Sequence, residues 1–159
     1  MKSVAAFERT SRPSLKPSTA SVPSWDPPSE RADGFFIVFP EYNHSFPGTL
    51  KRMLDSELKN YIHKPVAFGG VSSSQWGGVR GIEALLSPVR EMGLVSTFTD
   101  MQFPKIQELF DDEGHLLNEA YRDYIKGAWE ELIWMSKVMK YGRDNVESKH
   151  HKQSAQAEN

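Results

Sequence analysis

The chain has 159 residues and a mass of 18.1 kDa, enough for one domain around a single hydrophobic core and too little for two catalytic domains. A balance of 19 Lys and Arg against 21 Asp and Glu gives a net charge of -2, without the basic excess that nucleic acid or an anionic membrane surface would require. The absence of cysteine excludes disulfides, Cys-ligated zinc, iron-sulfur clusters and a thiol nucleophile.

Residues 1–32 are predicted to be a disordered leader, because they are rich in Pro and Ser and hold few aliphatic residues. The apolar stretch Val4 to Phe7 is too short for a signal-peptide core, and no run is long enough for a transmembrane helix. We therefore expect a cytoplasmic protein. A transit peptide is the alternative, although the prolines of the leader would break its amphipathic helix.

The first predicted strand is the apolar run Phe35 to Phe39, bounded by Gly34 and Pro40 and expected to be buried on both faces. A helix should follow, opening at Pro47 and Gly48. Its apolar residues recur at helical spacing as far as Tyr61, which predicts one continuous helix over 48–61.

The second predicted strand is Val66 to Val71, and its two central glycines indicate the close approach of another backbone. Residues 72–78 form a loop, and a helix follows over 79–92. Pro88 should either kink or restart that helix, and Gly93 is its expected C-terminal cap.

The rest of the chain supplies a third strand at 94–99, an ambiguous segment at 101–110, and a final helix with an apolar stripe from Leu117 to Met139. Asp111 to Gly114 is predicted to be a turn. Residues 143–159 are expected to be a flexible polar tail, its two histidines included, and we expect no metal site.

The alternation of strand and helix predicts an α/β protein with parallel strands and right-handed crossovers. Ligands of such sheets bind beyond the carboxyl ends of the strands, where the loops 40–48 and 72–78 should lie. Both loops offer backbone amides, hydroxyls and aromatic rings. This composition suits a flat heteroaromatic ligand with polar edges.

Several motifs resemble those of the NADPH-dependent FMN reductase family of flavodoxin-like proteins. They are Pro40-Glu41-Tyr42-Asn43 after an apolar strand, the later Lys64-Pro65-Val66-Ala67, and a Ser- and Gly-rich turn that ends in Gly77-Gly78 and Arg80. Phe110 to Gly114 before a final helix is also similar. The resemblance runs from about Asp33 to Lys140.

The resemblance implies a flavodoxin-like, doubly wound parallel sheet in a three-layer α/β/α arrangement, with FMN and NADPH as cofactors and an assembly of dimers or tetramers. Hydride would pass from the nicotinamide to the flavin and on to a small-molecule acceptor such as a quinone, azo dye, metal oxyanion or flavin. No acid-base pair is needed. The resemblance places FMN against Pro40, Glu41, Tyr42, Asn43 and Ser45 of the first loop and Ser73, Ser74, Gly77 and Gly78 of the second. Arg80 is a candidate for a 2'-phosphate of NADPH.

The chain also departs from this family, whose members begin with a strand, a phosphate-binding loop, a helix and a second strand. We therefore expect an N-terminally truncated domain over 33–142, with the strand 35–39 exposed as an edge. Two functions follow as alternatives. One is an FMN-dependent reductase, impaired by the loss of the phosphate loop. The other is a non-catalytic flavodoxin-like remnant that pairs with a full-length homologue.

Overall fold

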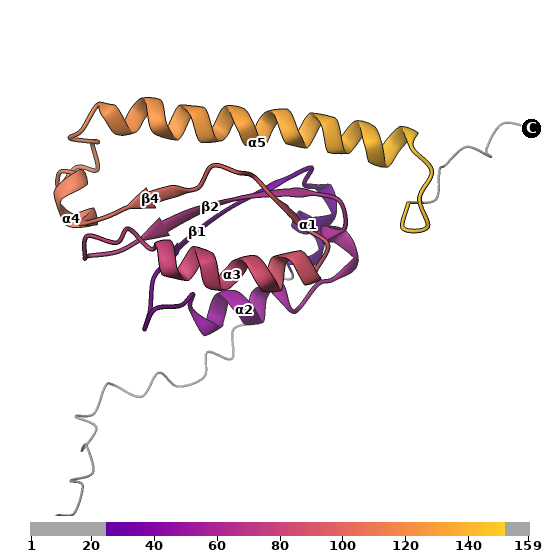
Figure 1. Ribbon diagram of the computed structural model, residues 1–159, viewed down its shortest axis with the longest axis horizontal. Coiled ribbons are helices and arrows are strands. Elements are labelled where there is room, and N and C mark those ends of the chain that lie inside the picture. The colour runs from indigo at the N-terminus through magenta and orange to yellow at the C-terminus, as the bar shows by residue number, and fades with distance from the viewer. Residues whose placement is uncertain (1–24, 152–159) are drawn as a thin grey trace, which may run out of the picture.

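The computed structural model describes residues 25–151 and contains one parallel sheet (Figure 1). Its central strand is β2 (Pro65–Val71), which pairs with β1 on one side and with both β3 and β4 on the other. The strands are β1 (Phe35–Pro40), β2 (Pro65–Val71), β3 (Val95–Ser96) and β4 (Met101–Phe103). The parallel pairing predicted from the sequence is confirmed.

Helices cover both faces of this sheet. α5 lies across one face, and α2 and α3 lie against the other, which makes three layers (Figure 1). The helices are α1 (Asp26–Arg31), α2 (Gly48–Leu54), the 3-10 turn η1 (Lys59–Tyr61), α3 (Val79–Glu91), α4 (Ile106–Leu109) and α5 (Ala120–Asn145). None of the helices in the described part of the chain combines the length and apolar character needed to cross a bilayer.

The main core lies between β1, β2 and α3, where alternate residues of β1 point towards the helix. Phe68 and Ile82 are fully buried there. α3 runs through Pro88 without a break and is followed by Gly93 at a φ of 86°. The predicted helix and its glycine end are both confirmed, because one apolar face and a left-handed C-terminal residue specify them locally.

The helix after the first strand is shorter than predicted. α2 ends at Leu54, and Leu58, expected on its apolar stripe, is 61% exposed. The side chain of Glu57 explains the break: one carboxylate oxygen accepts hydrogen bonds from the backbone N–H groups of Leu58, Lys59 and Asn60. These bonds start the separate turn η1 and hold the pKa of Glu57 below its usual value despite partial burial.

Two further predictions about the sheet were wrong in part. β1 is buried on one face only, since Val38 is 54% exposed. The third strand is not continuous over 94–99 but is divided into β3 and β4, and the ambiguous segment after residue 100 supplies β4. Between them the side chain of Thr97 is buried, and its backbone N–H donates to the carbonyl of Val66.

The described structure begins inside the predicted leader. Trp25 and α1 pack on the domain, because the indole N–H of Trp25 donates to the Tyr61 hydroxyl at 2.6 Å and Ser29 is fully buried. The amino group of Lys64 donates to the carbonyls of Ser29 and Glu30. The domain therefore extends at least eight residues beyond the boundary expected at 32/33, and the remainder of the predicted leader, residues 1–24, lies outside the described residues.

Candidate functional site

The first loop closes into a tight turn directly after β1. The backbone N–H of Tyr42 donates to the carbonyl of Ser45 at 2.8 Å, and the N–H of Ser45 donates back to Tyr42 at 3.0 Å. Asn43 and His44, between them, both have positive φ, 52° and 63°. Two consecutive left-handed residues are rare outside glycine and give a type I′ geometry, which lifts Tyr42 to 61% exposure above the end of the strand.

The second loop is fixed by glycine backbones. Gly77 and Gly78 have φ values of 56° and 81°, and a Cβ on Gly70 would lie 2.8 Å from the Gly77 carbonyl oxygen. The close approach predicted from the glycines of β2 is therefore confirmed at Gly70. Ser73 and Ser74 are exposed, and the hydroxyls of Ser72 and Ser74 lie 2.9 Å apart.

A partly buried ion pair joins the first loop to the start of α3, directly after the second loop. Glu41 Oε1 lies 2.5 Å from Arg80 Nη2, and the side chain of Glu41 is only 4% exposed. The same guanidinium lies 2.8 Å from His44 Nε2 and 5.5 Å from the ring centre of Trp76. Glu41 thus turns its carboxylate into the protein rather than towards the open face. Arg80, the candidate for a 2'-phosphate, is held by the chain's own groups.

The outer face of the two loops presents two aromatic rings, Tyr42 and Trp76, which are 61% and 52% exposed. Pro40 and Asn43 are also exposed, whereas Ser45 is half-buried. Beneath them, Glu41 Oε2 is buried with no hydrogen-bond partner in the described residues. Such a surface fits the ring system of a flavin, because aromatic faces stack on it and polar atoms meet its edge.

The same edge fits a phosphate group less well. Arg80 is paired with Glu41, and Lys105, which follows β4, is paired with Glu108 at 3.2 Å. Within residues 25–151, these two basic side chains beside the loops are thus already neutralised by carboxylates. The described loops therefore provide contacts for the flavin ring and leave the phosphate without a free cationic partner at this edge.

A cavity of about 520 Å³ adjoins the second loop on the side of α5. Its walls come from the second loop, β4 and the first turn of α5: Gln75, Trp76, Gly77, Val79, Gln102, Pro104, Ala120, Tyr121 and Tyr124. Of the residues predicted to bind the cofactor, it contains Gly77 alone. The sequence analysis placed Tyr121 and Tyr124 on the buried stripe of the last helix, and their spacing of three residues gives no sign that they also line a cavity.

Asp100 is a half-buried residue that is hydrogen-bonded to Tyr124 in the wall of this cavity. Its Oδ1 has no hydrogen-bond partner among the described residues, while its backbone carbonyl accepts a hydrogen bond from the Tyr124 hydroxyl. Burial, followed by the nearby charge of Glu83, raises the pKa of Asp100 to about 6. The sequence analysis did not single it out, because its burial depends on the division between β3 and β4.

Sequence comparisons agree with the motifs of the two loops. The family model of NADPH-dependent FMN reductases matches residues 6–105. An NAD(P)H-dependent FMN reductase of Pseudomonas aeruginosa is 26% identical over 113 residues, covering 67% of this chain and 61% of that protein. A quinone reductase of Pseudomonas putida is 32% identical over 106 residues, 60% and 54% of the two chains. An NADPH azoreductase of a Bacillus species is 36% identical over 55 residues, which cover 34% of this chain and 31% of that protein.

Structural comparison agrees with the three-layer architecture. The flavoenzyme FerB of Paracoccus denitrificans, an NAD(P)H:acceptor oxidoreductase, superposes with a TM-score of 0.61 at 22% identity, over 70% of this chain and 65% of that one. The fold is therefore flavodoxin-like, as expected from the sequence. The chain spans less than two thirds of the length of each of these relatives.

Proposed function

Because the chain belongs to the NADPH-dependent FMN reductase family, we propose that it is an NAD(P)H-dependent, FMN-binding oxidoreductase. The observation that supports this proposal best is the Glu41–Arg80 ion pair, which ties the first loop to the start of α3, where Arg80 also lies against Trp76 of the second loop. Open parallel sheets bind their ligands at this edge. Two exposed aromatic rings, Tyr42 and Trp76, stand on the two loops beside this pair.

In this proposal the side chains bind and orient the cofactor and perform no acid-base step. When bound, FMN accepts hydride from the nicotinamide and passes electrons to the acceptor. Tyr42 stacks on the flavin ring, and backbone N–H groups of both loops meet its polar edge. Ser73 and Ser74, exposed on the second loop, supply hydroxyls to the same edge.

We propose a small-molecule acceptor for this activity. The relatives include a quinone reductase and an azoreductase, and quinones and azo compounds are flat conjugated molecules. The cavity beside Trp76, with Tyr121 and Tyr124 in its wall, offers aromatic faces to a molecule of that shape. Acceptor choice would then depend on the shape of this open region rather than on a charged group.

Titration of the full chain with FMN, followed by flavin fluorescence, tests the proposal. Stoichiometric binding and anaerobic bleaching of the flavin by NADPH are expected. Tyr42→Ala should weaken binding about five- to 160-fold, because stacking on an aromatic ring contributes about 1–3 kcal/mol. Tyr141→Ala is the matched control, since Tyr141 is a similarly exposed tyrosine, 66% against 61%, far along α5.

Two results would count against the reductase. A folded chain that binds neither FMN nor riboflavin at high micromolar concentration does not act alone as a flavoenzyme. If Tyr42→Ala and Tyr141→Ala lose the same affinity for FMN, the first loop does not contact the flavin.

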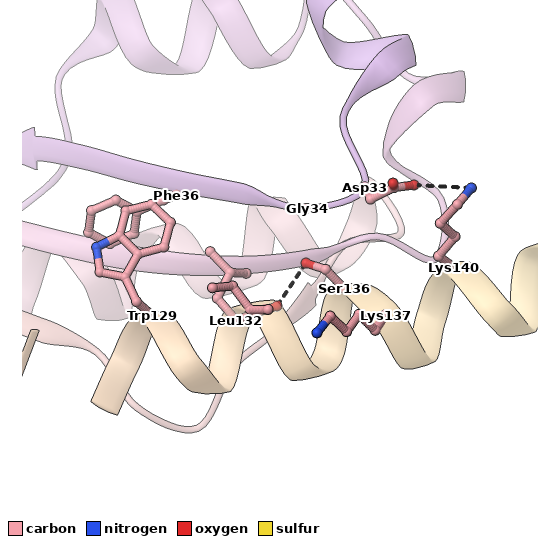
Figure 2. Close-up of a pocket in the computed structure, with 9 residues that line it drawn as sticks. Asp33, Gly34, Phe36, Trp129, Leu132, Ser136, Lys137 and Lys140 are labelled. Carbon is pink, nitrogen blue, oxygen red and sulfur yellow. Dashed lines mark hydrogen bonds and ion pairs between the residues drawn. The ribbon is translucent and has the colours of Figure 1, made fainter. Parts of the chain in front are cut away.

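A second candidate function, docking of another chain, rests on the outer edge of β1. Among the described strands β1 pairs only with β2, and its face towards α5 stays partly open. A groove of about 490 Å³ runs there between β1 and α5 (Figure 2). In it the rings of Phe36 and Trp129 lie 4.8 Å apart, and Asp33 faces Lys140 at 3.8 Å (Figure 2).

We propose that the occupant of this edge is a second copy of the chain. Two identical open edges complement each other in an antiparallel pair, which satisfies the backbone groups of both. The adjoining exposed side chains of α5, Ile133 at 48% and Trp134 at 62%, would be covered by the same contact.

Light scattering after size exclusion tests this docking. Val38→Lys, a charge on the open edge, should convert a dimer into a monomer, while Leu58→Lys, an equally exposed aliphatic position on another layer, should not. If the parent chain is monomeric and binds a full-length homologue instead, the occupant of the β1 edge is the homologue and not a second copy. A monomer that binds neither would contradict the proposal.

A further inference from the structure

Three histidines that are far apart in the sequence meet at the end of β2 opposite the two loops. His63 Nδ1 lies 2.9 Å from His151 Nε2, across a separation of 88 residues. The ring of His150 meets that of His63 edge-on, with 5.7 Å between centres. The sequence predicts no metal site, because apart from the adjacent pair His150 and His151 its histidines show no ligand spacing along the chain. We call His63, His150 and His151 the histidine cluster.

The backbone holds His63 in place. Its N–H donates to the Gly93 carbonyl at 2.9 Å, and its own carbonyl accepts a hydrogen bond from Arg143 at 2.8 Å. Its φ of 59° is left-handed, so the residue occupies a conformation that most side chains avoid. A ring fixed in this way is preorganised as a ligand.

A turn presents the two histidines from the C-terminal segment. The N–H of His151 donates to the Ser148 carbonyl, and the N–H of His150 donates to the Ser148 hydroxyl, both at 3.2 Å. His63 is half-buried and His150 is exposed beside a broad groove that both residues help to line. An ion can therefore reach the cluster from solvent.

From this geometry we propose that His63 and His151 bind a divalent transition-metal ion of tetragonal preference, Cu²⁺ or Ni²⁺. Two imidazole nitrogens at ~2.0–2.1 Å from one ion lie ~2.9 Å apart when they bind at a right angle and ~3.4 Å apart around a tetrahedral ion. The observed separation of 2.9 Å is that of a hydrogen bond between the two rings, so an ion that binds them at a right angle fits in place of the shared proton with little displacement of either ring. Both nitrogens must then present lone pairs, so the ring that now donates moves its proton to its other nitrogen.

Two neighbouring cations limit the affinity, but each is already paired. Arg143 donates to the Asp33 carboxylate at 2.7 Å, and the amino group of Lys64 is held by the backbone carbonyls of Ser29 and Glu30. The proposal is independent of the flavin site, which lies at the carboxyl end of the strands. Failure of one leaves the other standing.

A second group of possible ligands makes the test sharper. Ligand atoms of Asp111, Glu113 and His115 lie within 4.8 Å of one another on an exposed turn. There His115 Nδ1 already lies 2.9 Å from an Asp111 oxygen. His115→Ala therefore serves as the matched control, because it removes a histidine that also has neighbouring acids but belongs to the other group.

The experiment is a calorimetric titration of the full chain, purified without a polyhistidine tag, with NiCl₂, followed by CuCl₂ and electron paramagnetic resonance to count nitrogen ligands. One ion per chain and two nitrogen ligands are expected. His151→Ala and His63→Asn should each weaken binding at least tenfold, and His115→Ala should change it less than twofold. Asparagine tolerates the left-handed backbone at position 63, so that variant should fold.

Three outcomes would overturn the proposal. These are no binding of either ion at about 100 µM, binding that persists in both cluster variants, and binding that only His115→Ala removes. Zinc bound more tightly than Ni²⁺ would overturn the assignment to a tetragonal ion.

Discussion

Glu41 and Arg80 form an asymmetric ion pair, since the side chain of Glu41 is 4% exposed and that of Arg80 is 33% exposed. Each also has a buried polar atom, Glu41 Oε2 and Arg80 Nε, without a hydrogen-bond partner in the described residues. Removing one partner therefore has a different effect from removing the other. The buried carboxylate depends on the pair more than the guanidinium does.

Arg80→Met should destabilise the domain by about 3 kcal/mol, because it leaves the Glu41 charge buried and unpaired. Glu41→Gln should lose only about 1 kcal/mol, since an amide still accepts a hydrogen bond from Arg80. Urea unfolding of both variants measures the difference. Equal losses would show that the pair is solvated in solution.

Gly78→Ala should destabilise the domain by about 3 kcal/mol or more. The residue has a φ of 81°, and a Cβ there would lie 2.6 Å from the backbone nitrogen of Val71. Gly127→Ala is the control, because its Cβ meets nothing within 4 Å and it should stabilise α5 by about 0.5–1 kcal/mol. Thermal unfolding of the two variants should shift in opposite directions.

Asp100 should make the domain less stable as the pH rises from about 4 to about 6. Its pKa is raised to about 6 in the fold, so between those values the folded chain binds more protons than the unfolded chain. Asp100→Asn should remove this dependence of stability on pH. It should also stabilise the domain by about 1 kcal/mol at pH 7, an effect that is reduced by the partial contact of Asp100 with solvent. Melting curves at pH 4.5 and 7 test the sign, with Asp112→Asn as an exposed control. A variant that is less stable than the parent at pH 7 would contradict it.

Riboflavin should bind nearly as tightly as FMN, within about tenfold. The basic side chains Arg80 and Lys105 beside the loops are paired with carboxylates, so neither of these two offers the phosphate an unpaired charge. Parallel fluorescence titrations measure the ratio. A preference of a hundredfold or more for FMN would show that the chain anchors the phosphate with other groups.

The sequence predicted the elements whose ends are marked locally. β2 lies between a proline and a polar loop, and α3 has one apolar face and a terminal glycine, so short-range patterns were sufficient for both. The end of α2 was missed because the apolar spacing continues to Tyr61, whereas the carboxylate of Glu57 starts a new turn. The spacing of apolar residues carries no signal for a side-chain cap of this kind.

The candidate site was predictable to a similar degree. Loop residues could be placed at one edge of the sheet because parallel strands end together. The direction of the Glu41 side chain could not be predicted, because it depends on Arg80 in another element. The meeting of His63 and His151 is still less accessible, because no spacing along the chain relates residues 88 positions apart.

The second loop owes its position to contact between the backbones of Gly70 and Gly78 rather than to its side chains. Residues 73–76 are exposed, and Gln75 and Ser73 carry little of the packing. Replacements at these two positions should leave the frame of the domain intact while altering what a bound molecule meets. The loop is thus a place where selection, or a designer, could change the preferred acceptor in single steps without first having to restore the stability of the fold.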